Sequence, residues 1–205
     1  MKDVRAKRAF LIALVAIMAL ITLLYARRSV DGQMAIERQY PRKNAALSLN
    51  MEHGGVIRIE GEGKLYNNDL KAMLRQADVK NSEVRDVIVG DGITEIGYMT
   101  FNHVRNLKTL KLGSGVRRVA PGAVKGCESL EWLYFPPSLV DVAADFLFES
   151  DQCRVVTGGE ASDLPALGNV KGSERKLTGI DSIDKLQAAV GDEVILPDAL
   201  ALWWR

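Results

Sequence analysis

Three 23-residue segments follow one another without a gap: VIVGDGITEIGYMTFNHVRNLKT (87–109), LKLGSGVRRVAPGAVKGCESLEW (110–132) and LYFPPSLVDVAADFLFESDQCRV (133–155). Six columns of this alignment are apolar in every segment: Val87/Leu110/Leu133, Val89/Leu112/Phe135, Ile93/Val116/Leu139, Ile96/Val119/Val142, Phe101/Val124/Leu147 and Leu107/Leu130/Cys153. Because only 47% of the 205 residues are apolar, eighteen matches in eighteen places indicate an internal repeat. Self-similarity at a fixed period predicts stacked units rather than an ordinary globular domain.

Turn-forming residues occupy the same place in each segment, as Gly-Asp-Gly, Gly-Ser-Gly and Pro-Pro-Ser at 90–92, 113–115 and 136–138. Glycine takes positive φ without steric cost and proline fixes φ, so both residues suit one shared bend. Alternating apolar residues on either side predict short strands with Val87 and Val89 facing the core, followed by Ile93 and Ile96. Each repeat therefore reads strand, turn, strand, turn.

Residues 87–132 resemble the BspA-like leucine-rich repeat, a 23-residue repeat of bacterial surface proteins. The first segment matches that pattern at Ile93, Ile96, Gly97, Phe101 and Leu107, and the second adds Ala123, Gly126, Cys127 and Leu130. The stretch Gly54–Gly63 also resembles the lead-in before the first repeat of such proteins. The third segment departs from the pattern, with DFLF in place of the Ala-Phe step and Ser150 in place of the cysteine.

The resemblance implies a mainly β fold with short helices: a leucine-rich-repeat solenoid of about three 23-residue turns, with N- and C-terminal caps. An apolar segment before the repeats adds one transmembrane helix to this expected fold. We place the N-terminal cap at 47–83, the repeats at 84–156 and the C-terminal cap at 157–205. The N-terminal cap should hold an edge strand at Val56–Glu60 and an amphipathic helix at Asp69–Ala77, capped by Asn68. The C-terminal cap should hold a helix that starts at Ser182 and stops at Gly191, then final strands or a plug formed by 194–196 and 200–204.

Eighteen residues without a charge, Ala9–Ala26, precede the repeats. As a helix they reach about 27 Å, enough to cross the hydrocarbon core of a bilayer. Arg27 and Arg28 follow directly and no small-x-small cleavage site precedes them, which favours an uncleaved anchor over a signal peptide. We expect a cytoplasmic tail at 1–8, a transmembrane anchor or uncleaved signal at 9–26, a linker at 27–46 and an extracytoplasmic repeat domain. If the segment is cleaved, the protein is secreted.

Charge divides the chain unevenly. Residues 1–28 carry six basic and one acidic side chain, a net charge of +5, and the remainder carries 21 basic and 25 acidic side chains, a net charge of −4. A mildly acidic domain argues against nucleic acid as a partner, since phosphate binding needs a basic surface. The column Glu95/Arg118/Asp141 alternates in sign and predicts ion pairs between neighbouring turns, which would fix their register.

Catalytic and metal-binding motifs are missing from the sequence. Neither His53 nor His103 begins a metal-ligand spacing, and the GEG stretch at 61–63 lacks the lysine and the helix start of a phosphate loop. We therefore expect no enzyme activity, no cofactor and no metal. Cys127 and Cys153 fall in core columns, which favours buried free thiols and leaves a disulfide as the alternative.

Two outward columns of the first strand carry candidate partner-binding residues: Ile88, Lys111, Trp132 and Tyr134. Exposed aromatic side chains anchor interfaces. The alternative for Trp132 and Tyr134 is packing under the C-terminal cap, with Trp203 and Trp204 as companions.

Three functions follow as expectations. The first is a membrane-anchored extracytoplasmic leucine-rich-repeat module that binds a protein or glycan, or mediates adhesion at the cell surface. The second is a structural or scaffolding subunit of a bacterial envelope complex that associates through Ala9–Ala26. The third is an enzyme with its site in the C-terminal region, which a pocket of convergent polar groups would support.

Overall fold

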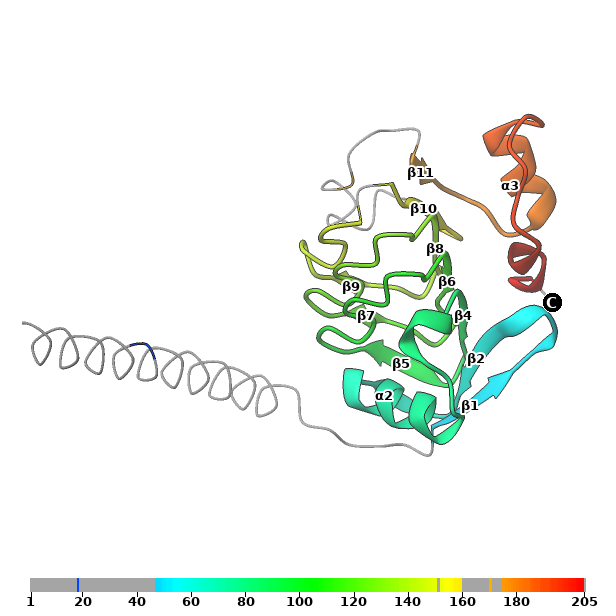
Figure 1. Cartoon of the computed structure of the whole chain (residues 1–205). Coiled ribbons are helices and arrows are strands. Elements are labelled where there is room, and N and C mark those ends of the chain that lie inside the picture. The colour runs from blue at the N-terminus through cyan, green and yellow to red at the C-terminus, as the bar shows by residue number, and fades with distance from the viewer. Residues whose placement is uncertain (1–17, 19–46, 151, 160–169, 171–174, 205) are drawn as a thin grey trace, which may run out of the picture. The chain divides into compact units, whose positions relative to one another are not determined.

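The computed structural model describes Met18 and residues 47–150, 152–159, 170 and 175–204 (Figure 1). Residues 42–205 form one compact unit, so the caps and the repeats are parts of one body. Within the described residues the fold is mainly strands with few short helices.

A seven-stranded sheet runs along one side of the repeats, in the order β1-β2-β4-β6-β8-β10-β11. The strands are β1 (Ser48–Met51), β2 (Val56–Glu60), β4 (Asp86–Val89), β6 (Thr109–Lys111), β8 (Trp132–Phe135), β10 (Arg154–Thr157) and β11 (Lys176–Leu177). All neighbours are parallel except β1 and β2, which pair antiparallel. The hairpin of β1 and β2 is closed by a short 3-10 turn, η1 (His53–Gly55).

A second, four-stranded parallel sheet has the order β3-β5-β7-β9. Its strands are β3 (Gly63–Leu65), β5 (Ile93–Ile96), β7 (Arg118–Val119) and β9 (Asp141–Val142). Each strand of this sheet follows a strand of the first sheet across one bend, as the repeat pattern predicts. The pair β2 and β3 adds a further strand pair before the three repeats, because Val56 and its neighbours continue the parallel ladder onto β4.

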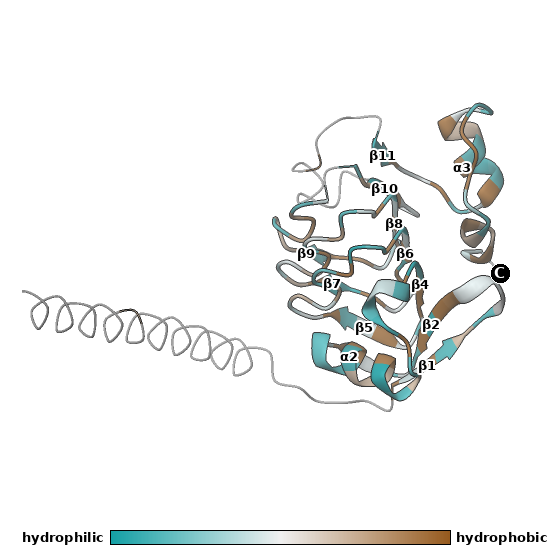
Figure 2. Ribbon diagram, viewed as in Figure 1, coloured by the Kyte–Doolittle hydropathy of each residue, from teal (hydrophilic) through white to brown (hydrophobic). Residues whose placement is uncertain are grey.

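The 23-residue period sets the strand register. Val87 pairs with Leu110 and Leu110 with Leu133, each 23 residues further along the chain, whereas Leu133 pairs with Val155, 22 residues further along. Of the six apolar columns, every residue is buried except Val142 and Leu147, which are half-buried and pack against the same core. The prediction of the core is confirmed, and Figure 2 shows the hydrophobic stretches on β2 and β4.

The third repeat differs inside the core. Phe146 occupies the column of Thr100 and Ala123, is buried, and packs on Phe135 with a ring-centroid distance of 5.4 Å. Since this ring fills the interior, Leu147 is only half-buried and Phe148 is exposed. The DFLF sequence therefore changes the last turn: Phe146, and not Leu147, is the side chain that fills the core there.

The bends are built differently from the prediction. None of the glycines at 90, 92, 113 and 115 has positive φ. They are needed because successive turns pass very close: a Cβ on Gly113 would lie 2.5 Å from the carbonyl oxygen of Gly90. Backbone proximity, rather than backbone conformation, thus excludes larger residues there.

Positive φ occurs instead in the second turn of every repeat, at one column: His103 (φ 55°), Gly126 (φ 66°) and Glu149 (φ 61°). Two residues other than glycine hold this left-handed conformation, which is uncommon for them. Because the same column has positive φ in all three repeats, this backbone conformation is imposed by the geometry of the stack.

The N-terminal cap contains helix α2 (Asn67–Gln76), which buries Leu70, Met73 and Leu74 on the core. The helix is confirmed, but it starts before the predicted Asn68, and the Asp69 carboxylate accepts a hydrogen bond of 3.1 Å from the Tyr66 backbone N–H at its entry. The prediction that Val56–Glu60 is an edge strand is wrong, because β1 pairs along its outer side. A short 3-10 turn, η2 (Asn81–Glu83), leads into β4.

The C-terminal cap contains helix α3 (Ile183–Val190), as predicted. Ser182 caps it by accepting a 3.3 Å hydrogen bond from the Lys185 N–H, and Gly191 ends it at φ 87°. The predicted final strands are absent from residues 192–204, where the chain instead forms the 3-10 helix η6 (Asp198–Leu202). This apolar segment packs against the sheet as a plug and does not extend it.

The predicted tail, anchor and linker at 1–46 lie outside the described residues, apart from Met18. In the part of the chain that is described, every helix is too short or too polar to cross a bilayer.

Candidate interaction surface

The outer face of the seven-stranded sheet carries the side chains that alternate with the core residues. Parallel register aligns them in two rows: Val56, Asp86, Thr109, Trp132 and Arg154 in one, and Arg58, Ile88, Lys111, Tyr134 and Val156 in the other. The sequence placed the four candidate partner-binding residues on this face, and the register brings Ile88, Lys111 and Tyr134 side by side.

The prediction that the aromatic residues of this face are exposed is wrong. Trp132 is 1% exposed, Tyr134 8% and Ile88 2%. Residues 180–204, which we call the C-terminal cover, pack on them through a second apolar cluster that includes Ile180, Leu186, Leu200 and Trp203. Packing beneath the C-terminal cap, the alternative, is what the structure shows. A partner-binding role for these four residues would therefore require the cover to leave the face.

Aromatic contacts hold the end of the cover to the sheet. The Tyr134 ring lies 5.7 Å from the Trp203 ring and 5.8 Å from the Trp204 ring, centroid to centroid, the second pair edge to face. Such pairs contribute about 0.5–1.5 kcal/mol each beyond the area they bury. On the other row, the Arg154 guanidinium lies 5.0 Å from the Trp132 ring centroid, in cation–π contact.

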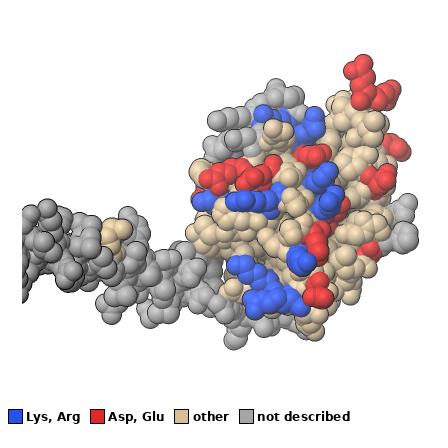
Figure 3. All heavy atoms as spheres, viewed as in Figure 1, with Lys and Arg blue, Asp and Glu red and all other residues tan. Residues whose placement is uncertain are grey.

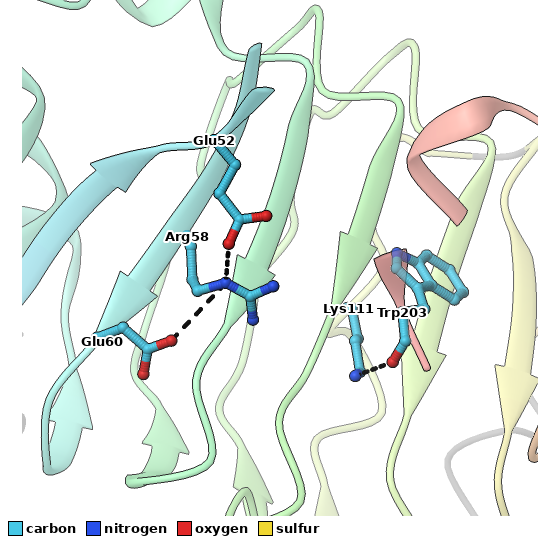
Figure 4. A network of polar contacts seen from close by, with 5 residues as sticks. All are labelled: Glu52, Arg58, Glu60, Lys111 and Trp203. Carbon is cyan, nitrogen blue, oxygen red and sulfur yellow. Dashed lines mark hydrogen bonds and ion pairs between the residues drawn. The ribbon is translucent and has the colours of Figure 1, made fainter. Parts of the chain in front are cut away.

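Lys111 is the charged member of the covered row. Its ammonium donates a hydrogen bond to the backbone carbonyl of Trp203, where the 3-10 helix η6 ends (Figure 4). Burial lowers the pKa of Lys111, and the nearby Asp91 carboxylate acts in the opposite direction. A cation at the carbonyl end of a helix is favourable, so Lys111 holds the C-terminal end of the cover in place on the sheet.

The other end of the same face is polar and only partly covered. Arg58 forms ion pairs with Glu52 and with Glu60, the latter at 3.9 Å, and these ion pairs raise the pKa of Arg58 (Figure 4). Beside them the Thr109 hydroxyl donates a 2.7 Å hydrogen bond to the Asp86 carboxylate. The face thus divides into an aromatic part beneath the cover and a charged part beside it.

The outer face of the second sheet carries a ladder of alternating charge. Parallel register aligns Lys64, Glu95, Arg118 and Asp141. Lys64 and Glu95 form an ion pair of 2.8 Å, and Arg118 and Asp141 one of 2.9 Å. The predicted pairing between neighbouring turns is confirmed for Arg118 with Asp141, while Glu95 pairs with Lys64 of the N-terminal cap. Figure 3 shows acidic and basic side chains in adjacent bands near β7 and β9.

A shallow groove of about 350 Å³ lies at the turns that connect the second sheet back to the first. Tyr98, Lys125 and Phe148 line it, one from each repeat. The Phe148 ring is 52% exposed and the Lys125 ammonium lies 5.0 Å from its centroid. The sequence analysis did not predict this groove. The signal was present in DFLF, because one core position can hold only one of its two phenylalanines and the other must be exposed.

Both cysteine thiols lie inside the stack. Cys127 and Cys153 are free and buried, and burial raises the pKa of both thiols, that of Cys127 to about 12. His103 is exposed, as predicted for a turn residue. In the described residues no three His, Cys, Asp or Glu side chains gather in a way that suits a metal ion.

Comparison with known proteins finds no matching family model and no similar curated protein. Among solved structures, a leucine-rich repeat protein from Eubacterium ventriosum aligns over 52% of this chain and 41% of its own, with 14% identity and a TM-score of 0.34. A leucine-rich cell surface protein from Faecalibacterium prausnitzii aligns over 60% of this chain and 34% of its own, with 20% identity and a TM-score of 0.40. This chain therefore spans less than half the length of either protein.

Proposed function

We propose that this chain is a membrane-anchored, extracytoplasmic leucine-rich-repeat protein of the BspA-like type, whose repeat domain binds a protein partner. The observation that carries the proposal is the 23-residue register, in which Val87, Leu110 and Leu133 follow one another across parallel strands. Such a stack repeats each outward position once per turn, and so builds an extended surface from few residues.

The binding surface is the groove lined by Tyr98, Lys125 and Phe148. Each repeat contributes two residues to its lining, and the apolar contacts of the C-terminal cover are on the first sheet instead. An exposed phenylalanine beside a cation and the Asp145 carboxylate combines the apolar centre and polar rim typical of protein interfaces.

Membrane anchorage rests on the sequence. Ala9–Ala26 is long and apolar enough to span a bilayer, and basic residues flank it on both sides. The mild net negative charge of residues 29–205 disfavours binding of nucleic acid by this domain. No cofactor, metal or enzymatic step enters this proposal.

Binding is tested with the soluble fragment from Ala45 onward, immobilised against envelope and host-cell extracts, and compared with the full chain in detergent. We expect the fragment to retain a partner, and Phe148→Ala to reduce retention at least fivefold. Met51→Ala is the matched control, because Met51 is equally exposed (54%) but lies on β1. Retention by the full chain alone would contradict the proposal and favour a scaffolding subunit that associates through Ala9–Ala26.

Location is tested by cysteine labelling, which the buried native thiols make clean. We expect a membrane-impermeant maleimide to label Glu62→Cys in intact spheroplasts, and Lys2→Cys only after lysis. The reverse pattern would contradict the orientation, and labelling of neither or both sites before lysis would contradict the anchor.

A further inference from the structure

A pocket of about 490 Å³ lies in the N-terminal cap, apart from both surfaces described above. Helix α2, the turn η2 and the loop Thr100–Val104 of the first repeat enclose it. Its volume falls within the range typical of ligand pockets. Sequence patterns did not predict this pocket, because its walls come from segments about thirty residues apart.

Asparagine side chains fix the walls of this pocket. The Asn67 amide donates to the carbonyls of Met99 (2.7 Å) and Thr100 (3.0 Å), and the Asn81 amide donates to the carbonyl of His103 (3.1 Å). The helix and the turn η2 are thereby bonded to the two ends of one loop. A site whose walls are held by such bonds is preorganised and loses little entropy when a ligand enters.

The rim of the pocket is basic. Lys71, Arg75 and Lys80 line it together with one acid, Asp78. Among the described residues none of these three cations forms an ion pair, and Figure 3 shows Lys and Arg side chains gathered over α2. The rim therefore carries an uncompensated positive charge, which attracts a carboxylate.

The floor of the pocket is aliphatic and holds one unused acceptor. Leu70, Leu74 and Val104 line it and are 1–4% exposed. The Asn102 side chain also lines it, and its buried Oδ1 accepts no hydrogen bond from the described residues. A buried acceptor without a donor is costly, so an N–H group from a ligand would be favoured there.

We propose that this pocket binds an apolar residue next to a carboxylate in a partner protein. The aliphatic floor takes the apolar side chain, the basic rim takes the carboxylate, and Asn102 accepts the backbone N–H. An aliphatic floor without an aromatic ring disfavours a sugar, whose flat face binds by stacking. The inference rests on the proposed function in assuming a protein partner, but it names a second site, independent of the Phe148 groove.

The test uses the full chain in detergent and three fluorescein-labelled peptides, followed by fluorescence polarisation at low salt. The first peptide ends in leucine with a free carboxylate. The second is amidated and carries an internal glutamate–leucine–glutamate, and the third replaces those glutamates by glutamine. We expect the first, the second or both to bind, which tells a terminal from an internal carboxylate, and the glutamine peptide to bind at least tenfold more weakly.

Charge reversal locates the site. Lys71→Glu with Arg75→Glu should weaken binding about tenfold and reduce its salt dependence, because both cations lie on the rim. Lys108→Glu with Arg117→Glu makes the same change of net charge at exposed positions outside the pocket and should change binding less than twofold. Equal weakening by both pairs, equal binding of the glutamine peptide, or no binding at all would overturn the proposal. Retention of a partner through Phe148 would survive each of these outcomes.

Discussion

The repeat stack and the C-terminal cover bury apolar side chains on opposite faces of one sheet, but they are held in different ways. In the stack, parallel hydrogen bonds and apolar columns act together, because each strand pairs with the next at the same interval. The cover, at residues 180–204, has no strand in that ladder. It is held by apolar side chains, by the bond from Lys111 to the Trp203 carbonyl and, where it begins, by a 2.9 Å hydrogen bond from the Ile180 N–H to the Thr157 carbonyl.

This difference implies two levels of stability. Removing a stack residue disturbs both the core and the ladder, whereas removing a cover residue lets one segment leave while the ladder remains. Regions with fewer shared interactions open at lower free energy than the core.

Phe101→Ala should lower the free energy of unfolding by about 3–5 kcal/mol, because it opens a cavity at a fully buried ring of the stack. Urea unfolding of the fragment from Ala45 onward measures the change. Phe148→Ala, on an exposed phenylalanine of the same domain, should change it by about 0.5 kcal/mol or less. Similar losses from the two variants would show that position in the stack does not decide the effect.

Trp203→Ala should cost about 2 kcal/mol or less, although Trp203 is as buried as Phe101. The loss is limited because undocking of the cover sets its maximum. Hydrogen exchange should show faster exchange in 180–204 and unchanged protection of β4, β6 and β8. Lost protection in those strands would mean that the cover and the stack unfold as one unit.

Alkaline pH should destabilise the interior of the stack. Burial raises the pKa of Cys127 to about 12 and also raises that of Cys153, so folding favours the protonated thiols. Their contribution is complete below the unfolded pKa of about 8.5 and is lost as pH rises toward the folded values, about 1 kcal/mol per thiol at pH 9.5.

Urea unfolding at pH 7.5 and 9.5 tests this loss, with Cys127→Ala/Cys153→Ala as the control. The double variant should lose less stability over that interval than the parent chain. An equal loss would assign the alkaline effect to other groups. The cover, by contrast, accepts a hydrogen bond from the charged Lys111 ammonium through the Trp203 carbonyl, whereas the interior of the stack excludes a thiolate.

Arg118→Ala should have the smallest effect, about 0.5 kcal/mol or less, because its ion pair with Asp141 is exposed on the outer surface of the stack. A double-mutant cycle with Asp141→Ala, measured at low and high salt, gives the coupling. A coupling above about 1 kcal/mol, or one insensitive to salt, would show that the charge ladder does more than fix register.

Much of the fold could be predicted because it is periodic. The columns headed by Val87 and Leu107 recur every 23 residues, so their burial followed from spacing alone. The helix from Ser182 to Gly191 carries its own start and stop signals, and both act as expected. The strand β1 was missed because Ser48–Met51 is short and lacks a repeat partner, which made Val56–Glu60 resemble an edge.

The candidate surfaces were harder to predict. Trp132 and Tyr134 were correctly placed on the outer face, but their exposure depended on residues about seventy positions later. The Phe148 groove arises because Phe146 takes the core position, a choice between two phenylalanines that spacing does not make. The pocket at Asn102 depends on hydrogen bonds from Asn67 and Asn81 across the chain.

By itself the sequence determined the period, the core columns and the strand register, since stacking identical units requires the same residue types at equal intervals. The tertiary structure decided which outward faces stay open. Apolar residues at 180–204 pack on the apolar face formed by Ile88, Tyr134 and Val156. Removing that face from water makes it inaccessible to a partner. This hydrophobic contact is non-directional and joins distant segments, so no local pattern encodes it.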